Sequence, residues 1–238
     1  MENYIRSENA KIWTDISGAK NDRHVVLCNG GPGCCDYLLP VSQMIDDGYN
    51  VIRFEQRGCG RSDKDGRYDI MTALSDLEAI RNYYGVDSWI VGGHSWGAAL
   101  SLLYAILHPE RTSSLLFIAG LSVQNNKEWY AEFIANRGGE VLPDFLYPFN
   151  EEVNKAGNAS FRKYIQSPGL YRDISKLPMP ALFMCAKKDI RPNWQTEQIS
   201  ALIEKSKLVC IAQAAHYIWL THYDEMRLEL RKFLRLPL

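Results

Sequence analysis

The sequence has no long apolar run, no block of like charge, no low-complexity tract and no internal repeat. No apolar stretch approaches the roughly 18 residues of a membrane-spanning helix. The N-terminal segment MENYIRSENAKIW carries early acidic residues and no apolar core, unlike a secretory signal. The 27 basic and 28 acidic residues leave a formal net charge of −1, which indicates neither a nucleic-acid nor a membrane partner. We therefore expect a soluble, cytoplasmic protein.

Cysteine pairs of the CxxC type are also absent, and the spacings of the six cysteines do not suit a zinc site. Cys28, Cys185 and Cys210 lie in apolar runs typical of buried strands, where free thiols behave as small hydrophobes. Cys34 and Cys35 are adjacent in a loop, where a redox-sensitive pair is the alternative to ordinary loop residues. We expect the cysteines to be reduced and no metal to be bound.

What the sequence does contain is a regular alternation of short apolar runs with helical stretches, over a length of 238 residues that suits one domain or a domain with an insertion. Apolar runs typical of buried strands occupy residues 24–28, 50–54, 88–91, 113–118, 181–185 and 208–211. Helical spacing covers residues 36–47, 70–84, 96–107 and 224–234. This pattern predicts an α/β protein with a doubly wound, mostly parallel sheet, and leading strands within residues 4–16 at one edge.

The alternation stops between residues 121 and 177, where the sequence is rich in aromatic residues and shows no strand pattern. Residues 128–137 and 151–165 could each form a helix. A segment of this length is too long for a simple connection. We interpret residues 121–177 as a lid over a pocket at the carboxyl ends of the strands, and residues 1–120 and 178–238 as the core domain. A peripheral packing insertion is the alternative.

The strongest chemical motif is Gly93-His94-Ser95-Trp96-Gly97, which matches G-x-S-x-G between a predicted strand and a predicted helix. The turn is sharp, so small residues are needed on both sides of the serine. The serine oxygen then projects above the sheet at the N-terminus of a helix, where free backbone N–H groups favour developing negative charge. We therefore predict that Ser95 is a catalytic nucleophile.

A serine hydroxyl needs a base, and the base needs an orienting acid that precedes it in chain order in this arrangement. His216 follows the predicted strand 208–211 by a short loop, which makes it the candidate base, with His222 as a weaker alternative. Asp189 follows the predicted strand 181–185 and is the candidate acid; a helix-capping role is its alternative. No metal or organic cofactor is required for this chemistry.

The glycine-rich turn Gly30-Gly31-Pro32-Gly33 follows the first predicted core strand. Glycines let the backbone turn its N–H groups toward a bound oxygen. We assign the two oxyanion donors to the backbone N–H groups of Gly31 and Trp96, while an ordinary glycine turn is the alternative. A phosphate-binding loop is disfavoured because no GK[ST] follows. Four aromatic side chains, from the lid segment and beside the base, are expected to contact substrate: Trp129, Phe133, Phe145 and Tyr217.

Four segments resemble the proline iminopeptidase branch of the α/β-hydrolases. They are N-G-G-P-G at 29–33, F-E-Q-R-G-C-G-R-S at 54–62, G-G-H-S-W-G at 92–97 and H-P-E-R-T-S-S-L-L-F at 108–117. The resemblance implies an α/β-hydrolase fold and an aminopeptidase activity. In that branch a large helical cap supplies carboxylates that hold the substrate's free amino group. Here the insertion is much shorter, and the carboxylates that could serve are Glu128, Glu132 and Asp144.

These observations together predict a serine hydrolase that cleaves an ester or amide bond of a small molecule or short peptide. A carboxylesterase or lactonase without peptidase activity is one alternative, because the aromatic lid segment is short. A non-enzymatic binding protein on the same fold is another, although the complete set of Ser95, Asp189 and His216 argues against it. The sequence does not indicate an oligomeric state.

Overall fold

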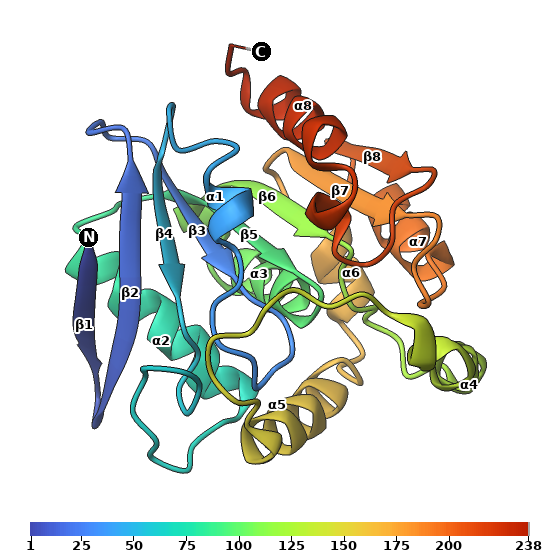
Figure 1. The fold of residues 1–238 in the computed structure, drawn as a ribbon, viewed down its shortest axis with the longest axis horizontal. Coiled ribbons are helices and arrows are strands. Elements are labelled where there is room, and N and C mark those ends of the chain that lie inside the picture. The colour runs from blue at the N-terminus through green and yellow to red at the C-terminus, as the bar shows by residue number, and fades with distance from the viewer. Residues whose placement is uncertain (238) are drawn as a thin grey trace.

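In the computed structural model, which describes residues 1–237, eight strands form one sheet in the order β1-β2-β4-β3-β5-β6-β7-β8 (Figure 1). The strands are β1 (Glu2–Ser7), β2 (Ala10–Gly18), β3 (His24–Cys28), β4 (Asn50–Phe54), β5 (Trp89–His94), β6 (Thr112–Ile118), β7 (Ala181–Ala186) and β8 (Ser206–Ile211). The first two strands pair in antiparallel fashion at one edge, and β4, β3, β5, β6, β7 and β8 are parallel. The predicted α/β fold with a mostly parallel sheet is therefore confirmed.

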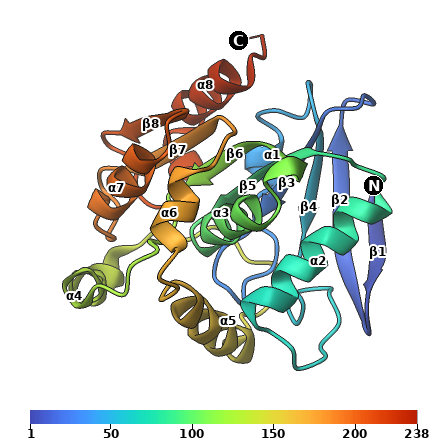
Figure 2. The ribbon, with the colours of Figure 1, turned by 180° about the vertical axis from the view of Figure 1, so that it is seen from behind.

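Helices cover both faces of this sheet. They are α1 (Leu39–Ser42), α2 (Ile70–Tyr83), α3 (Trp96–Leu107), α4 (Lys127–Asn136), α5 (Glu151–Tyr164), α6 (Leu170–Ser175), α7 (Trp194–Leu202) and α8 (Tyr223–Leu234). Short 3-10 helices span Pro109–Arg111, Arg137–Gly139 and Ile218–Leu220. The view from behind shows α2 and α3 across one face, whereas α1 and α8 lie on the other (Figure 2).

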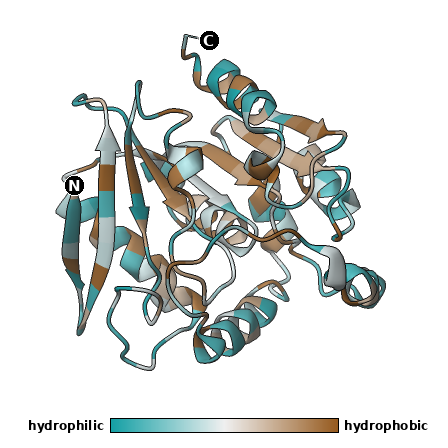
Figure 3. Ribbon diagram, in the orientation of Figure 1, coloured by the Kyte–Doolittle hydropathy of each residue, from teal (hydrophilic) through white to brown (hydrophobic). Residues whose placement is uncertain are grey.

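The core consists of two apolar layers, one on each face of the sheet. Side chains alternate along each strand, so Val26, Val91 and Phe117 pack toward α2 and α3. Val25 and Leu116 point the other way and pack with residues of α1 and α8. Because both faces are buried, the central strands carry mainly apolar runs, and the hydropathy colouring shows this (Figure 3).

Two predicted elements differ from the structure. Residues 36–47 contain only the four-residue helix α1, which does not begin earlier because Pro40 has no N–H and restricts the residue before it. Beyond Ser42 the chain continues in turns with i→i−3 hydrogen bonds, such as that from the Ile45 N–H to the Ser42 carbonyl. The strand predicted at residues 88–91 runs on to His94, because the glycines that indicated its end pair with β3 and β6.

The segment between β6 and β7 carries the helices α4, α5 and α6 and, within the described chain, no strand. Helices α4 and α5 agree closely with the predictions, and α6 was not predicted. Figure 1 places α4 and α5 beyond the carboxyl ends of the parallel strands. No helix within residues 1–237 is long and apolar enough to cross a membrane.

The expectation that the cysteines are reduced is wrong for one pair. Cys185 and Cys210 are direct partners in the β7–β8 register and form a disulfide. Cys28, Cys34, Cys35 and Cys59 are free. No sequence pattern indicated the pairing, because partners 25 residues apart become neighbours only when the two strands align.

Candidate active site

Ser95 lies in a strained turn between β5 and α3. Its φ of 58° falls in a region that residues with a side chain rarely adopt. Gly93 and Gly97 allow the turn: a Cβ on Gly97 would lie 2.0 Å from the Cys28 carbonyl oxygen, and one on Gly93 would lie 2.3 Å from the Gly97 backbone. The backbone of Ser95 is fixed by hydrogen bonds to Ile118 and from Leu121, of 3.0 and 3.1 Å. The structure thus holds Ser95 at the carboxyl end of the sheet.

Asp189 and His216 come together at the ends of neighbouring strands. Asp189 follows β7 and His216 follows β8, and the His216 Nδ1–H donates to Asp189 Oδ2 over 2.6 Å. Both side chains are almost fully buried, with exposed fractions of 3% and 2%. The His216 ring lies 4.5 Å, centroid to centroid, from the ring of His94, the residue before Ser95. The Ser95 hydroxyl forms no hydrogen bond with any of residues 1–237. Such contacts are often long before substrate binds.

The carboxyl of Asp189 is surrounded by donors. Burial alone would raise its pKa, but His216 and Arg191 hold the pKa below its ordinary value of 3.8. The second oxygen, Oδ1, accepts hydrogen bonds from the backbone N–H and the guanidinium of Arg191, at 2.9 and 3.1 Å. Asp189 does not cap α7, whose N-cap is Asn193. Its carboxylate therefore stays ionised and orients the imidazole of His216.

Sequence reasoning missed two residues beside this pair. Glu140, from the predicted lid segment, forms a two-pronged ion pair with Arg191. Arg191 also lies 4.9 Å above the ring of Phe133. One side-chain ligand atom from each of Glu140, Asp189 and His216 lies within 4.8 Å of the other two, which is close enough for a metal ion. The Arg191 guanidinium bridges the two carboxylates, so this group is an ion-pair network.

His94 is a third residue whose role the sequence did not reveal. Its Nε2 lies 3.0 Å from the His216 carbonyl, which can only accept, so Nε2 carries the proton. Its Nδ1 therefore accepts from the Tyr37 hydroxyl at 2.8 Å, and that oxygen accepts from the Gly30 N–H at 2.7 Å. Burial, reinforced by neighbouring His216, keeps the pKa of His94 well below 6.5. A neutral imidazole thus joins the glycine turn to the loop that carries His216.

The glycine turn presents its backbone beside Ser95. Gly31 has a φ of 121°, and its carbonyl accepts from the Asn154 side chain of α5 at 2.8 Å. The backbone N–H groups of Gly31 and Trp96 have no hydrogen-bond partner in the part of the chain that the structure describes. Two free donors flanking Ser95 are what the predicted oxyanion hole requires, and that assignment remains a prediction.

The four aromatic residues predicted to contact substrate separate into two groups. Trp129 and Phe133 stack on each other in α4, and the Trp129 indole N–H donates to the Pro192 carbonyl at 3.0 Å. Phe145 and Tyr217 instead meet at the ring of Tyr37, at centroid distances of 5.6 and 5.8 Å. The first group lies against the loop that follows Asp189, and the second lies beside His216.

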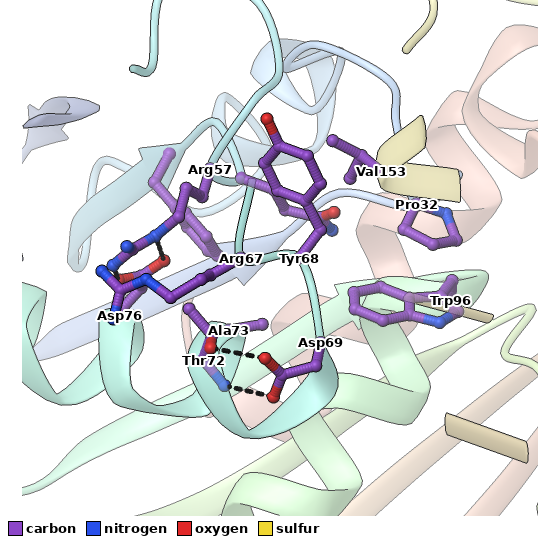
Figure 4. Close-up of a pocket in the computed structure, with 12 residues that line it drawn as sticks. Pro32, Arg57, Arg67, Tyr68, Asp69, Thr72, Ala73, Asp76, Trp96 and Val153 are labelled. Carbon is purple, nitrogen blue, oxygen red and sulfur yellow. Dashed lines mark hydrogen bonds and ion pairs between the residues drawn. The ribbon is translucent and has the colours of Figure 1, made fainter. Parts of the chain in front are cut away.

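A hollow on the other side of the elbow is shown in Figure 4. Pro32, Trp96 and Val153 line one wall, and Arg57 and Asp76 lie at the opposite end. Its charged groups are already satisfied: Arg57 is ion-paired with Asp76, and the Asp69 carboxylate caps α2. Trp96 lines this hollow, whereas Ser95 and His216 do not.

Comparison with known proteins identifies the family of this chain. The sequence profile of the alpha/beta hydrolase fold family matches residues 23–149, more than half of the chain. The chain therefore belongs to the α/β hydrolase fold family. Within it, the chain resembles the proline iminopeptidase branch. It is 37% identical over 127 residues to the proline iminopeptidase of Saccharolobus solfataricus and 32% over 143 residues to that of Xylella fastidiosa.

These matches cover 51% and 58% of this chain but only 41% and 44% of the relatives, so the chain spans less than half of their length. Solved structures match over nearly the whole chain at lower identity. The enol-lactonase of Burkholderia xenovorans has a TM-score of 0.79 at 18% identity, covering 98% of this chain and 100% of its own. The proline iminopeptidase of Mycobacterium smegmatis has a TM-score of 0.76 at 15% identity, covering 99% and 98%. These structural likenesses show the fold.

Proposed function

We propose that the protein is a serine hydrolase that cleaves an ester or amide bond of a small molecule or short peptide through an acyl-enzyme. Ser95 is the nucleophile, His216 the base and Asp189 the orienting acid. The observation that carries the proposal is the buried Asp189–His216 hydrogen bond, set against a strained serine turn at the ends of the parallel strands. We also propose that residues 121–177 act as the lid of the site and the remaining residues as its core domain.

In the proposed reaction, His216 takes the proton of Ser95 as the serine oxygen attacks the substrate carbonyl. The backbone N–H groups of Gly31 and Trp96 hold the resulting oxyanion. Protonated His216, stabilised by Asp189, then gives its proton to the leaving alcohol or amine, and the acyl-enzyme remains. Water attacks that ester with His216 again as base, which releases the acid and restores Ser95.

The first candidate for the substrate class is the amino-terminal peptide bond, by similarity to the proline iminopeptidases. A specific observation favours esters or lactones instead. Glu128, Glu132 and Asp144, which could hold a free amino group, are exposed to solvent. The lid carboxylate closest to His216 is Glu140, and Arg191 already pairs with it. A substrate amine would have to compete with that guanidinium, so we also propose carboxylesterase or lactonase activity as the second candidate.

The nucleophile is tested first with a fluorophosphonate probe and with p-nitrophenyl acetate. Wild-type protein should be labelled, whereas Ser95→Ala should not be labelled and should lose on the order of 10⁴–10⁶ in turnover. Ser113→Ala is the matched control, because Ser113 is exposed on β6. A wild-type protein that does not react with the probe would instead support a non-enzymatic binding protein.

The substrate class is tested with prolyl-p-nitroanilide, its N-acetylated form and p-nitrophenyl esters. Cleavage of the free amine form alone supports the iminopeptidase candidate. Cleavage of esters, with no effect of a free amine, supports the esterase candidate.

A further inference from the structure

The side-chain amide of Gln195 is buried without a partner. Gln195 lies in the first turn of α7 and is 1% exposed. Neither its amide nitrogen nor its amide oxygen forms a hydrogen bond with any other group in residues 1–237. A buried amide that gives up its bonds to water destabilises the folded state, so each such group calls for an explanation.

Gln195 lines a small cavity next to the proposed catalytic residues. The other walls include Ser122, Trp129, Asp189, Arg191 and Thr196. The cavity therefore lies between the end of β6, the lid helix α4 and the loop that carries Asp189. The β6 wall is tied directly to the nucleophile, because the Leu121 N–H donates to the Ser95 carbonyl. A group bound in the cavity would adjoin the reacting centre.

The lining identifies the kind of group that fits. The Gln195 amide offers an N–H donor beside a carbonyl acceptor, which is complementary to a second amide. A charged group is disfavoured, because Asp189 repels anions and Arg191 repels cations while each is already paired with the other. A neutral carboxamide or peptide group can satisfy both atoms of Gln195 at once.

The cover of the cavity is a helix with few buried contacts. Trp129 belongs to α4, and no residue of that helix is buried. An element with so few buried contacts opens at low cost in free energy. In this structure the cavity has room for about one water molecule, so a substrate group enters it only when α4 shifts.

We propose that this cavity is a substrate subsite for a neutral carboxamide or peptide group, and that Gln195 is the residue that recognises it. The proposal rests on the proposed function in taking Ser95 as the neighbouring nucleophile. It predicts that preferred substrates carry an amide close to the scissile bond, whether that bond is an ester or an amide.

Binding is tested in Ser95→Ala protein, so that turnover plays no part. Propanamide and butanone have nearly the same shape, but only propanamide has N–H donors. Propanamide at millimolar concentrations should shift the NMR signal of the Gln195 side-chain NH₂, which is identified by its loss in Gln195→Leu. It should bind about tenfold more tightly than butanone, as one or two net hydrogen bonds would give. In Gln195→Leu this preference should vanish.

Thermal unfolding supplies a second, independent measurement. Leucine nearly matches the shape of glutamine and has no polar atoms, so Gln195→Leu should raise the Tm by about 2–4 °C. Gln198→Leu makes the same change at an exposed site of α7 and should leave both the Tm and propanamide binding unchanged.

Equal binding of propanamide and butanone to the Ser95→Ala protein would overturn the subsite. So would a crystal structure in which a water on the Gln195 amide stays in place when propanamide is present, or a Tm that falls in Gln195→Leu. Failure of the proposed function appears elsewhere, as unchanged turnover in Ser95→Ala. The two ideas can therefore fail separately.

Discussion

At the scale of single residues, His94 shows how a side chain outside the predicted triad can hold the site together. Both of its ring nitrogens are engaged, by Tyr37 on one side and by the His216 carbonyl on the other. Its neighbours Tyr217 and Trp219 enclose the ring, at centroid distances of 5.0 and 4.8 Å. Protonation would remove the acceptor that Tyr37 needs and would bury an unpaired charge.

The resulting prediction concerns stability against pH. The pKa of His94 is well below 6.5 in the folded protein, so below pH 6.5 the unfolded chain binds more protons than the folded one. The contribution of neutral His94 to the free energy of unfolding is complete above pH 6.5. Below that value the free energy of unfolding should fall by up to about 1.4 kcal/mol per pH unit. Urea unfolding between pH 5.0 and 7.5 measures the slope.

His94→Gln keeps one donor and one acceptor but does not titrate. Its free energy of unfolding should therefore depend less steeply on pH, by that amount. His222→Gln, a change at a histidine outside the core, is the control and should keep the wild-type slope. Equal slopes in wild type and His94→Gln would show that His94 does not carry the pH dependence.

The position of a residue relative to the strands decides whether its place in the site could be predicted from the sequence. Ser95, Asp189 and His216 each follow a strand, and parallel strands end at one edge, so their sequence positions already place them together. Glu140, Gln195 and Tyr37 follow no such rule. Each lies in a loop or a helix, and only folding of the chain decides what its side chain meets.

At the scale of elements, the disulfide joins the two strands that lead into the proposed acid and base. Cys185 lies four residues before Asp189 and Cys210 six residues before His216. The strands are hydrogen-bonded along their length, so the disulfide reinforces an existing pairing. Disulfides persist mainly in oxidising compartments, and the cytoplasmic location stays a prediction from sequence.

Closing a loop of 25 residues should stabilise the folded protein by about 3.5 kcal/mol, through loss of chain entropy in the unfolded state. Reduction with dithiothreitol should lower the free energy of unfolding by about this amount, as measured by urea denaturation. A variant with both Cys185→Ala and Cys210→Ala is the control, because its stability should not respond to the reductant. An unchanged midpoint in reduced wild-type protein would contradict a stabilising disulfide.

At the scale of the whole molecule, the Glu140–Arg191 ion pair ties the proposed lid to the core. The two side chains are 13% and 15% exposed, so solvent screens them only partly. Arg191 also bonds Asp189, which in turn bonds His216. Any movement of the proposed lid would therefore change the charge around His216.

This linkage predicts a shift in the pKa of the Asp189 carboxyl when its cationic partner is removed. Arg191 is one of the groups that hold this pKa below 3.8, so Arg191→Gln should raise it. NMR titration of the Asp189 carboxyl carbon measures the change.

Glu132→Gln, an exposed position on α4, provides the control and should leave the pKa of Asp189 in place. An unchanged pKa of Asp189 in Arg191→Gln would argue against an electrostatic link between Arg191 and the acid.

The sequence by itself determined the α/β class, the elbow at Ser95 and the chain order of acid and base, because strand periodicity and turn chemistry act between near neighbours. Only the tertiary structure decided the Cys185–Cys210 disulfide, the Glu140–Arg191 contact and the unpartnered amide of Gln195. Each of these depends on which side chains meet after the chain has folded, and no local pattern in the sequence encodes those contacts.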